Sequence, residues 1–345
     1  MFVLLRRGFT LTALALLLLV MDALSMPGAH ASAPVAKIVG PPSYHISLFA
    51  SGTKSYFNPD SITVDGNHIF VSYMNNTLPD GSDHQPSTIV EYSNSKQVLH
   101  IFSVLGHCDG LRVDPTTHLV WALVNNDANP GLYTINPVNQ QITPYTFPAP
   151  PHGGGYDDLA FINGMAFISA SNPTLNGSGM NVNPAVDQIT LSGNTVVLKP
   201  VLYGNATATD ITTGQTVTLN EVDPDALSLD SQGNVVLVNQ AGSELVFIKN
   251  PGTPQQSVSR LLVGTQLDDT VWATSTIGRM FVVDKTLNAI YLVRSSKFVV
   301  GTAYTETPSD SGVNNFVGTV NLTSGVVTPV LTGFSNPTGL IFVQG

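Results

Sequence analysis

Short segments with an aspartate at the same position recur along the chain and could bring several carboxylates together. Five segments carry the aspartate, namely Asn58-Pro59-Asp60-Ser61-Ile62, His107-Cys108-Asp109-Gly110-Leu111, Gly155-Tyr156-Asp157-Asp158-Leu159, Asp223-Pro224-Asp225-Ala226-Leu227 and Asp268-Asp269-Thr270-Val271. A sixth segment, Asn336-Pro337-Thr338-Gly339-Leu340, has Thr338 at that position. Carboxylate oxygens are hard ligands that suit Ca²⁺ best, with Mg²⁺, Mn²⁺ or Zn²⁺ as alternatives. The same aspartates could instead fix tight turns by accepting hydrogen bonds from backbone N–H groups.

The segments recur at intervals of roughly 45 to 70 residues, which is typical of a β-propeller. The second segment shows the repeating unit most clearly, because four short runs follow one another at 109–114, 119–124, 131–135 and 142–147. These runs are rich in β-branched and aromatic residues and are bounded by Asn, Pro and Gly, which indicates strands. Four strands joined by short turns form an antiparallel meander, the unit of one blade.

We therefore predict an all-β fold, a six-bladed β-propeller of four-stranded antiparallel blades, with five or seven blades as alternatives. After the fifth aspartate segment, residues 280–283 and 289–293 are expected to be the second and third strands of the same blade. Residues 339–343 would form a first strand without a second, so the strand at 44–49 would pair there and close the ring. The two longest intervals are expected to hold extra loops, at 172–183 and 302–315.

The innermost strands of a propeller line its central channel, so the recurring aspartates should surround one mouth of that channel. Residues that follow the second strands should join them there, namely Asn75, Asn125 with Asn126 and Asp127, Ser171 or Asn172, Asn239 and Asp284. Crowded carboxylates repel one another, so either their pKa values rise or a cation balances their charge. The predicted metal ligands are Asp60, Asp109, Asp157, Asp225, Asp269, Asn239 and Asp284.

Three residues near the mouth could move protons during catalysis: Asp225, Asp109 and His107, which precedes the second segment. Cys108 is the only cysteine of the chain. The neighbouring Asp109 disfavours its thiolate, so we do not expect a cysteine nucleophile. The sequence has no Gly-x-Ser-x-Gly elbow, phosphate-binding loop or zinc-protease motif.

The composition excludes several kinds of partner. The chain has 13 Lys and Arg against 23 Asp and Glu, a net charge of −10, and only 10% of its residues are charged. Nucleic acids and anionic membranes attract clustered basic residues, so neither is an expected partner. We expect a monomer that binds a small-molecule substrate, or a peptide or glycan, on its loop face.

The first 33 residues have the features of a secretory signal peptide. Arg6 and Arg7 precede an apolar run at 11–20, and small residues around Ala31 suit cleavage. The run is shorter than the roughly 20 residues that span a bilayer, which favours cleavage over a membrane anchor. We expect a secreted or periplasmic protein with one propeller domain at 34–345.

The repeats resemble two related groups of propellers. Residues 59–66 and 280–284 look like the NHL repeat, in which Pro-x-Gly-Ile-x-Val-Asp precedes a Val-x-Val-Ala-Asp strand. The segment at 224–227 is similar to the Pro-Asn-Gly-Leu segment of the regucalcin/gluconolactonase family, six-bladed enzymes that open sugar lactones with one divalent cation. By this resemblance Asp225 takes the place of a ligand Asn and Asp60 that of a ligand Glu. Asn239 stands at the position of a ligand Asp, and Asp284 keeps an Asp one blade later.

Three functions follow from these observations. The first is a secreted hydrolase that uses a divalent cation at the channel mouth to act on a lactone or ester. The second is a non-catalytic NHL-like propeller that binds a peptide, glycan or protein partner, with the loop at 172–183 as its recognition element. The third is a lyase on the same scaffold that acts on a cyclic or uronic substrate.

Overall fold

The structure is a computed structural model that describes residues 37–308 and 315–345, and these residues form strands and no helix. They belong to a unit at Ala36–Gly345, so the predicted signal peptide lies outside the described residues. None of the described residues forms a helix long and apolar enough to cross a membrane. The predicted all-β class is confirmed.

The strands form five sheets, and one of them has the predicted four strands in chain order. Its order is β2 (Pro59–Asp65), β3 (His68–Tyr73), β4 (Pro86–Ser93) and β5 (Val98–Leu105). An eight-stranded sheet joins two such meanders edge to edge through a bridge from Thr195 to Thr146. The first contains β6 (Cys108–Val113), β7 (Val120–Val124), β8 (Gly131–Asn136) and β9 (Gln141–Thr146). The second contains β10 (Leu159–Ile162), β11 (Met165–Ser169), β12 (Pro184–Ser192) and β13 (Thr195–Tyr203).

The third sheet has six strands, so the sheets do not correspond one to one to the predicted four-stranded blades. It contains β16 (Pro224–Leu229), β17 (Val235–Asn239), β18 (Glu244–Lys249) and β19 (Ser257–Leu262). A hairpin of β14 (Thr207–Asp210) and β15 (Thr216–Thr218) pairs with the outer edge of β19. The long interval between the third and fourth aspartate segments therefore holds this hairpin as well as the loop at 172–183.

The last two sheets exchange strands, which corrects the prediction for the fifth segment. β20 (Thr270–Trp272) pairs with β23 (Ala303–Thr307), followed by β24 (Phe316–Val320) and β25 (Val327–Thr332). The intervening hairpin of β21 (Gly278–Asp284) and β22 (Ala289–Ser295) joins the neighbouring sheet instead. There β21 pairs with β26 (Pro337–Gln344), and β22 pairs with β1 (His45–Ser51). The predicted loop at 302–315 thus contains β23.

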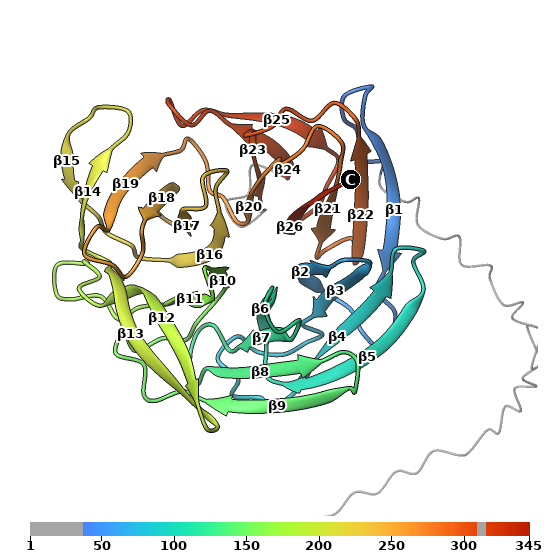
Figure 1. Cartoon of the computed structure of the whole chain (residues 1–345), viewed down its shortest axis with the longest axis horizontal. Helices are drawn as coiled ribbons and strands as arrows, with labels where there is room; N and C mark the ends of the chain where they lie inside the picture. Colours follow the sequence, from blue (N-terminus) through green and yellow to red (C-terminus); the bar gives the residue numbers. More distant parts are fainter. Residues whose placement is uncertain (1–36, 309–314) are drawn as a thin grey trace, which may run out of the picture. The chain divides into compact units, whose positions relative to one another are not determined.

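The sheets lie around a common centre, with β2, β6, β10, β16, β20 and β26 innermost (Figure 1). Each of these six strands contacts the next, and β26 contacts β2. The second strands β3, β7, β17 and β21 are almost wholly buried because neighbouring sheets cover both of their faces. The outermost strands β5, β9 and β13 consist mainly of exposed and half-buried residues, and β9 has no buried residue. This pattern gives sheets of propeller type.

Close packing at the centre explains two glycines of the repeat. A Cβ atom on Gly110 of β6 would meet the backbone oxygen of Asp157, and one on Gly339 of β26 would meet that of Asp60. The inner strands therefore approach one another at backbone distance beside the aspartates.

Candidate functional site

A β-bulge interrupts four of the inner strands at the recurring aspartate position. The pairing register shifts between Pro59 and Ile62, between Cys108 and Leu111, and between Pro224 and Leu227. The same shift occurs in β26 beside Thr338, opposite the end of β21. A bulge adds one unpaired residue and re-aims its side chain, which explains why the aspartates leave the regular alternation of the strand.

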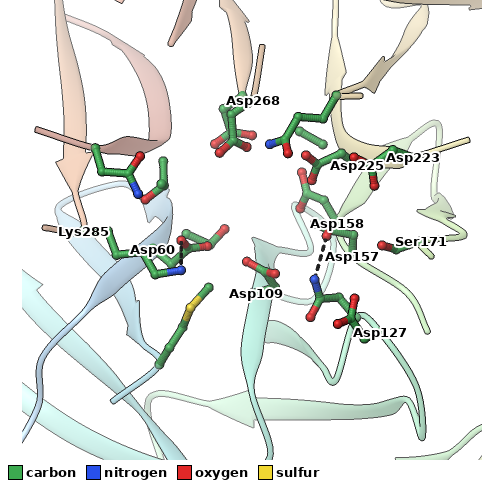
Figure 2. Close-up of a pocket in the computed structure, with 18 residues that line it drawn as sticks. Asp60, Asp109, Asp127, Asp157, Asp158, Ser171, Asp223, Asp225, Asp268 and Lys285 are labelled. Carbon is green, nitrogen blue, oxygen red and sulfur yellow. Dashed lines mark hydrogen bonds and ion pairs between the residues drawn. The ribbon is translucent and has the colours of Figure 1, made fainter. Parts of the chain in front are cut away.

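The recurring aspartates line one cavity of about 280 Å³. Figure 2 shows Asp60, Asp109, Asp157, Asp225 and Asp268 directed toward the same space from different inner strands. Nine aspartates line it in all, and the described lining residues include a single basic side chain, Lys285. The lining aspartates are Asp60, Asp109, Asp127, Asp157, Asp158, Asp223, Asp225, Asp268 and Asp269.

The fifth segment uses Asp268, and not Asp269, in the position of the other four aspartates. Asp158 and Asp269 are equivalent, because each carboxylate accepts a hydrogen bond from the next inner strand, at Leu227 N (3.0 Å) and Leu340 N (3.0 Å) respectively. Asp157 precedes Asp158, so its counterpart is Asp268. The predicted ligand Asp269 lines the cavity but is shifted by one residue from the repeat.

The recurring aspartates do not act as turn residues. Asp60, Asp109, Asp157, Asp225 and Asp268 accept no hydrogen bond from a backbone N–H within the part of the chain that the structure describes. Asp157 receives one bond from the Asn126 side chain, at 3.3 Å. These aspartate side chains are buried or half-buried, although their carboxyl groups do not hold the local backbone.

The carboxyl groups of the recurring aspartates raise one another's pKa values. Burial and the charge of Asp109 raise the pKa of Asp60 well above its usual range. Burial and the charge of Asp225 likewise raise the pKa of Asp157. The pKa of Asp268 is raised by burial and by the charge of Glu306. Burial and mutual repulsion therefore favour the protonated form of these groups more than water does.

Arg112 of β6 supports the floor of this site and connects several inner strands. Its guanidinium donates to Asp158 Oδ2 (2.6 Å) and to the backbone oxygens of Leu227 (3.0 Å) and Leu159 (3.1 Å). It also lies 3.8 Å from Asp269 Oδ1. Burial raises the pKa of Asp269 to about 7, although Arg112 opposes that shift. One side chain thus bridges β6 to β16 and to the segments that enter β10 and β20.

Three predicted site residues lie outside the cavity lining. His107 is buried, and its Nδ1 is within hydrogen-bonding distance of Thr77 Oγ1 (2.8 Å) and Thr77 O (2.9 Å). Asn239 donates to Glu244 Oε1 (2.9 Å) and accepts from Asp223 N (3.2 Å). Asp284 accepts hydrogen bonds from Leu287 N, Ser335 N and Asn336 N. Asn239 and Asp284 hold turns at the ends of β17 and β21, so the geometry supports neither as a ligand and does not support His107 as a proton carrier.

Cys108 and the aromatic residues beside the aspartates are structural. Burial, with the charges of Asp109 and Asp60, raises the pKa of the Cys108 thiol well above its usual range, which agrees with the expectation that it is not a nucleophile. Tyr156 stacks on Phe147 with ring centres 4.7 Å apart, and Trp272 packs edge-on against Phe247. None of these side chains lines the cavity.

Sequence reasoning missed Lys285 and the additional aspartates Asp158 and Asp223, whereas Asp127 and Ser171, which were expected at the mouth, do line the cavity. Lys285 follows β21, and its Nζ lies 3.8 Å from Asp60 Oδ1 (Figure 2). The doubled Asp157-Asp158 and Asp268-Asp269 were a usable signal, because both members of each pair line the cavity.

The stability of the cation-free protein should fall as the pH rises from about 4, the usual range of a carboxyl pKa in an unfolded chain, toward 7. Between these values the folded state holds protons on Asp269 and the other raised carboxyls that the unfolded chain has lost, so the free energy of unfolding decreases with pH. Urea unfolding in the presence of a chelator would measure the slope. Asp269→Asn should flatten it, and a stability that rises over this range would contradict the assigned pKa shifts.

Comparison with known proteins shows no family for this chain. No protein-family model matches the chain, and no curated protein matches its sequence. A protein of unknown function from Bacteroides caccae is 9% identical, covers 85% of this chain and 89% of its own, and gives a TM-score of 0.49. Virginiamycin B lyase from Staphylococcus aureus is 12% identical, with coverages of 81% and 89% and a TM-score of 0.44. A putative 6-phosphogluconolactonase from Bacteroides uniformis is 11% identical, with coverages of 81% and 86% and a TM-score of 0.43.

Proposed function

We propose that this protein is an exported enzyme that uses a divalent cation, Ca²⁺ by preference, to hydrolyse a lactone or ester in the aspartate cavity. The observation that carries the proposal is the gathering of nine aspartates and one lysine around about 280 Å³. Export rests on the predicted signal peptide at 1–33. The alternative is a non-catalytic propeller that binds a partner on the same face.

We further propose that the sheets represent six four-stranded blades in a closed ring. The eight-stranded sheet would count as two blades, and the β14–β15 hairpin as an addition to a third. The mixed sheet of β1, β22, β21 and β26 would be the closing blade. The cyclic contacts of the inner strands support this count.

The donor set fits a hard divalent cation in charge and in chemistry. Asp60, Asp109, Asp157 and Asp225 would hold it, since their carboxyl oxygens are not used by the backbone. Within residues 37–308 and 315–345, no three His, Cys, Asp or Glu side chains already form a metal-binding group. The raised pKa values of Asp60, Asp157 and Asp225 favour their protonated forms, so a cation would bind in competition with protons.

The bound cation would supply a Lewis acid for the carbonyl and would acidify water. The chain's own groups would handle the proton and the substrate. Asp268 is not among the proposed ligands, lines the cavity and has a pKa raised well above its usual range by burial and by the charge of Glu306, so it can serve as the acid for a leaving oxygen. Lys285 can bind a negatively charged part of the substrate beside Asp60.

Calcium binding measured near pH 7 should release protons, because the pKa values of Asp60 and Asp157 are raised in the cation-free protein and calcium must compete with protons for these carboxyls. Calorimetric titration of the exported chain with CaCl₂, in two buffers of different protonation enthalpy, would count the bound calcium and the released protons. The affinity should rise with pH over the same range.

The same experiment separates the two proposed functions. Binding of one calcium ion with proton release, followed by turnover in a panel of lactones and esters, would support the hydrolase. Calcium binding without turnover in any member of the panel would favour the non-catalytic propeller. A protein that binds none of Ca²⁺, Mg²⁺, Mn²⁺ or Zn²⁺ would rule out the cation site.

A further inference from the structure

A second cavity, of about 650 Å³, lies between the sheet of β2–β5 and the meander of β6–β9. Asp60, near the start of β2, lines the aspartate cavity, whereas Asp65, at the end of the same strand, lines this one. The two cavities therefore open at opposite ends of the inner strand. The volume suits a small organic ligand.

Glu91 of β4 fixes two histidines that line this cavity. Its Oε1 lies 2.5 Å from His68 Nδ1, and its Oε2 lies 2.7 Å from His100 Nδ1. Glu91 itself is 1% exposed, so both of its oxygens are committed to these two rings. A carboxylate only accepts hydrogen bonds, so each Nδ1 carries the proton and donates it. In a neutral ring this leaves Nε2 with a lone pair that accepts a hydrogen bond.

A third histidine repeats this arrangement on the other wall. His118, in the turn between β6 and β7, has Nδ1 at 3.0 Å from Asp65 Oδ2 and 3.2 Å from Asp65 Oδ1. None of the three Nε2 atoms has a hydrogen-bond partner among the described residues. The cavity lining therefore includes three imidazole rings. In each ring Nδ1 contacts a carboxylate, and Nε2 can accept a hydrogen bond from a ligand. Such second partners fix the orientation and the tautomer of a histidine.

The remaining wall is apolar and carries no positive charge. Phe70, Leu99, Leu119, Pro137 and Val138 line it, and no Lys or Arg does. Val138 is 91% exposed at the tip of the β8–β9 turn, an unusual position for a large aliphatic side chain. With neutral imidazoles, Asp65 and Glu91 give the lining a formal charge of −2, because each carboxylate contributes −1.

We propose that this cavity binds an organic ammonium ion with an apolar body, such as an arylalkylamine. The ammonium N–H groups would donate to the Nε2 atoms of His68, His100 and His118, and the carboxylates behind the rings would stabilise the positive charge. The apolar body would lie against Leu99, Leu119 and Val138. This site is independent of the aspartate cavity and of the proposed hydrolysis.

Three probes with the same phenyl group test the chemistry: 2-phenylethylamine, 2-phenylethanol and 3-phenylpropanoate. Calorimetry of the exported chain at about pH 8, where imidazole is ordinarily neutral, would compare them. The amine should bind best, the alcohol at least about tenfold more weakly, and the carboxylate not at all, since hydrogen bonds to charged groups are the stronger ones. Equal binding of amine and carboxylate would overturn the proposal.

Substitutions would test whether the amine binds in this cavity. His68→Ala and His100→Ala, which remove partly exposed rings, should each weaken amine binding by about tenfold, whereas His45→Ala on the outer strand β1 should not. The aspartate cavity could also attract an amine, so Asp225→Asn is measured in parallel and should leave the amine affinity unchanged. Loss of amine binding in Asp225→Asn, or its retention in both histidine variants, would show that the amine does not use this cavity.

Discussion

Asp225→Asn should weaken calcium binding by about hundredfold or more, because calcium affinity depends strongly on the number of charged ligands. The same variant should raise the free energy of unfolding of the cation-free protein. Asp225 is a buried carboxyl whose pKa is raised by burial and by the charges of Asp268 and Asp223, so its charge opposes folding at neutral pH. Asparagine has a similar shape and removes that cost. Calorimetry and urea unfolding would measure the two effects on one preparation.

Asp114→Asn provides a matched control with the same change of charge. Asp114 lies in the exposed turn after β6, where its carboxylate accepts hydrogen bonds from Thr116 N (2.9 Å) and Thr117 Oγ1 (2.6 Å). This variant should lose a little stability and keep its calcium affinity. If Asp225→Asn instead destabilised the protein and left calcium affinity intact, Asp225 would be a structural residue and the proposed ligand set would fail.

Arg112→Met should lower the free energy of unfolding by about 3 to 5 kcal/mol, because it would leave two buried carboxylates without their cation. Only 15% of the Arg112 side chain is exposed, and the Asp158 and Asp269 side chains are 5% and 9% exposed. The substitution would also remove the hydrogen bonds to the Leu159 and Leu227 backbone oxygens. Urea unfolding at neutral pH would measure the loss.

Arg294→Met on β22 is the control for Arg112→Met, since Arg294 is exposed and should cost little. The double variant Arg112→Met with Asp158→Asn should recover part of the lost stability by removing one of the unpaired charges. A loss no greater than that of the control would mean that Arg112 does not hold the inner strands together.

The recurring segments predicted the propeller-type fold and the meeting of the aspartates, because each segment is a local strand signal with fixed spacing. Which strands pair with one another depends on contacts between residues that are distant in the sequence. This explains why β21 and β22 were wrongly assigned to the sheet of β20. Their apolar pattern indicates buried strands and is equally compatible with either neighbouring sheet. The choice of Asp269 over Asp268 as the counterpart of the other aspartates has a related cause. Two aspartates are adjacent there, and only the contact of Asp269 with Leu340 N of another inner strand distinguishes them.

Arg112 and the histidine cavity could not be read from the sequence because they depend on contacts between distant segments. Arg112 lies in an ordinary strand run, and its partners at 158, 227 and 269 belong to three other inner strands. His68, His100 and His118 are likewise unremarkable in sequence, and only the pairing of β4 with β3 and with β5 brings two of them to Glu91.

The sheet that combines β1 and β26 has a consequence for the order of folding. It pairs His45 with Arg294 and Gly278 with Gln344, so its strands come from widely separated parts of the chain. Until residues 337–344 have left the ribosome, β21 has an unpaired edge and β2 lacks its neighbour β26. Such long-range pairing is slow to form and exposes strand edges meanwhile. The other sheets can assemble earlier, but the contact between β2 and β26 must be among the last to form during synthesis.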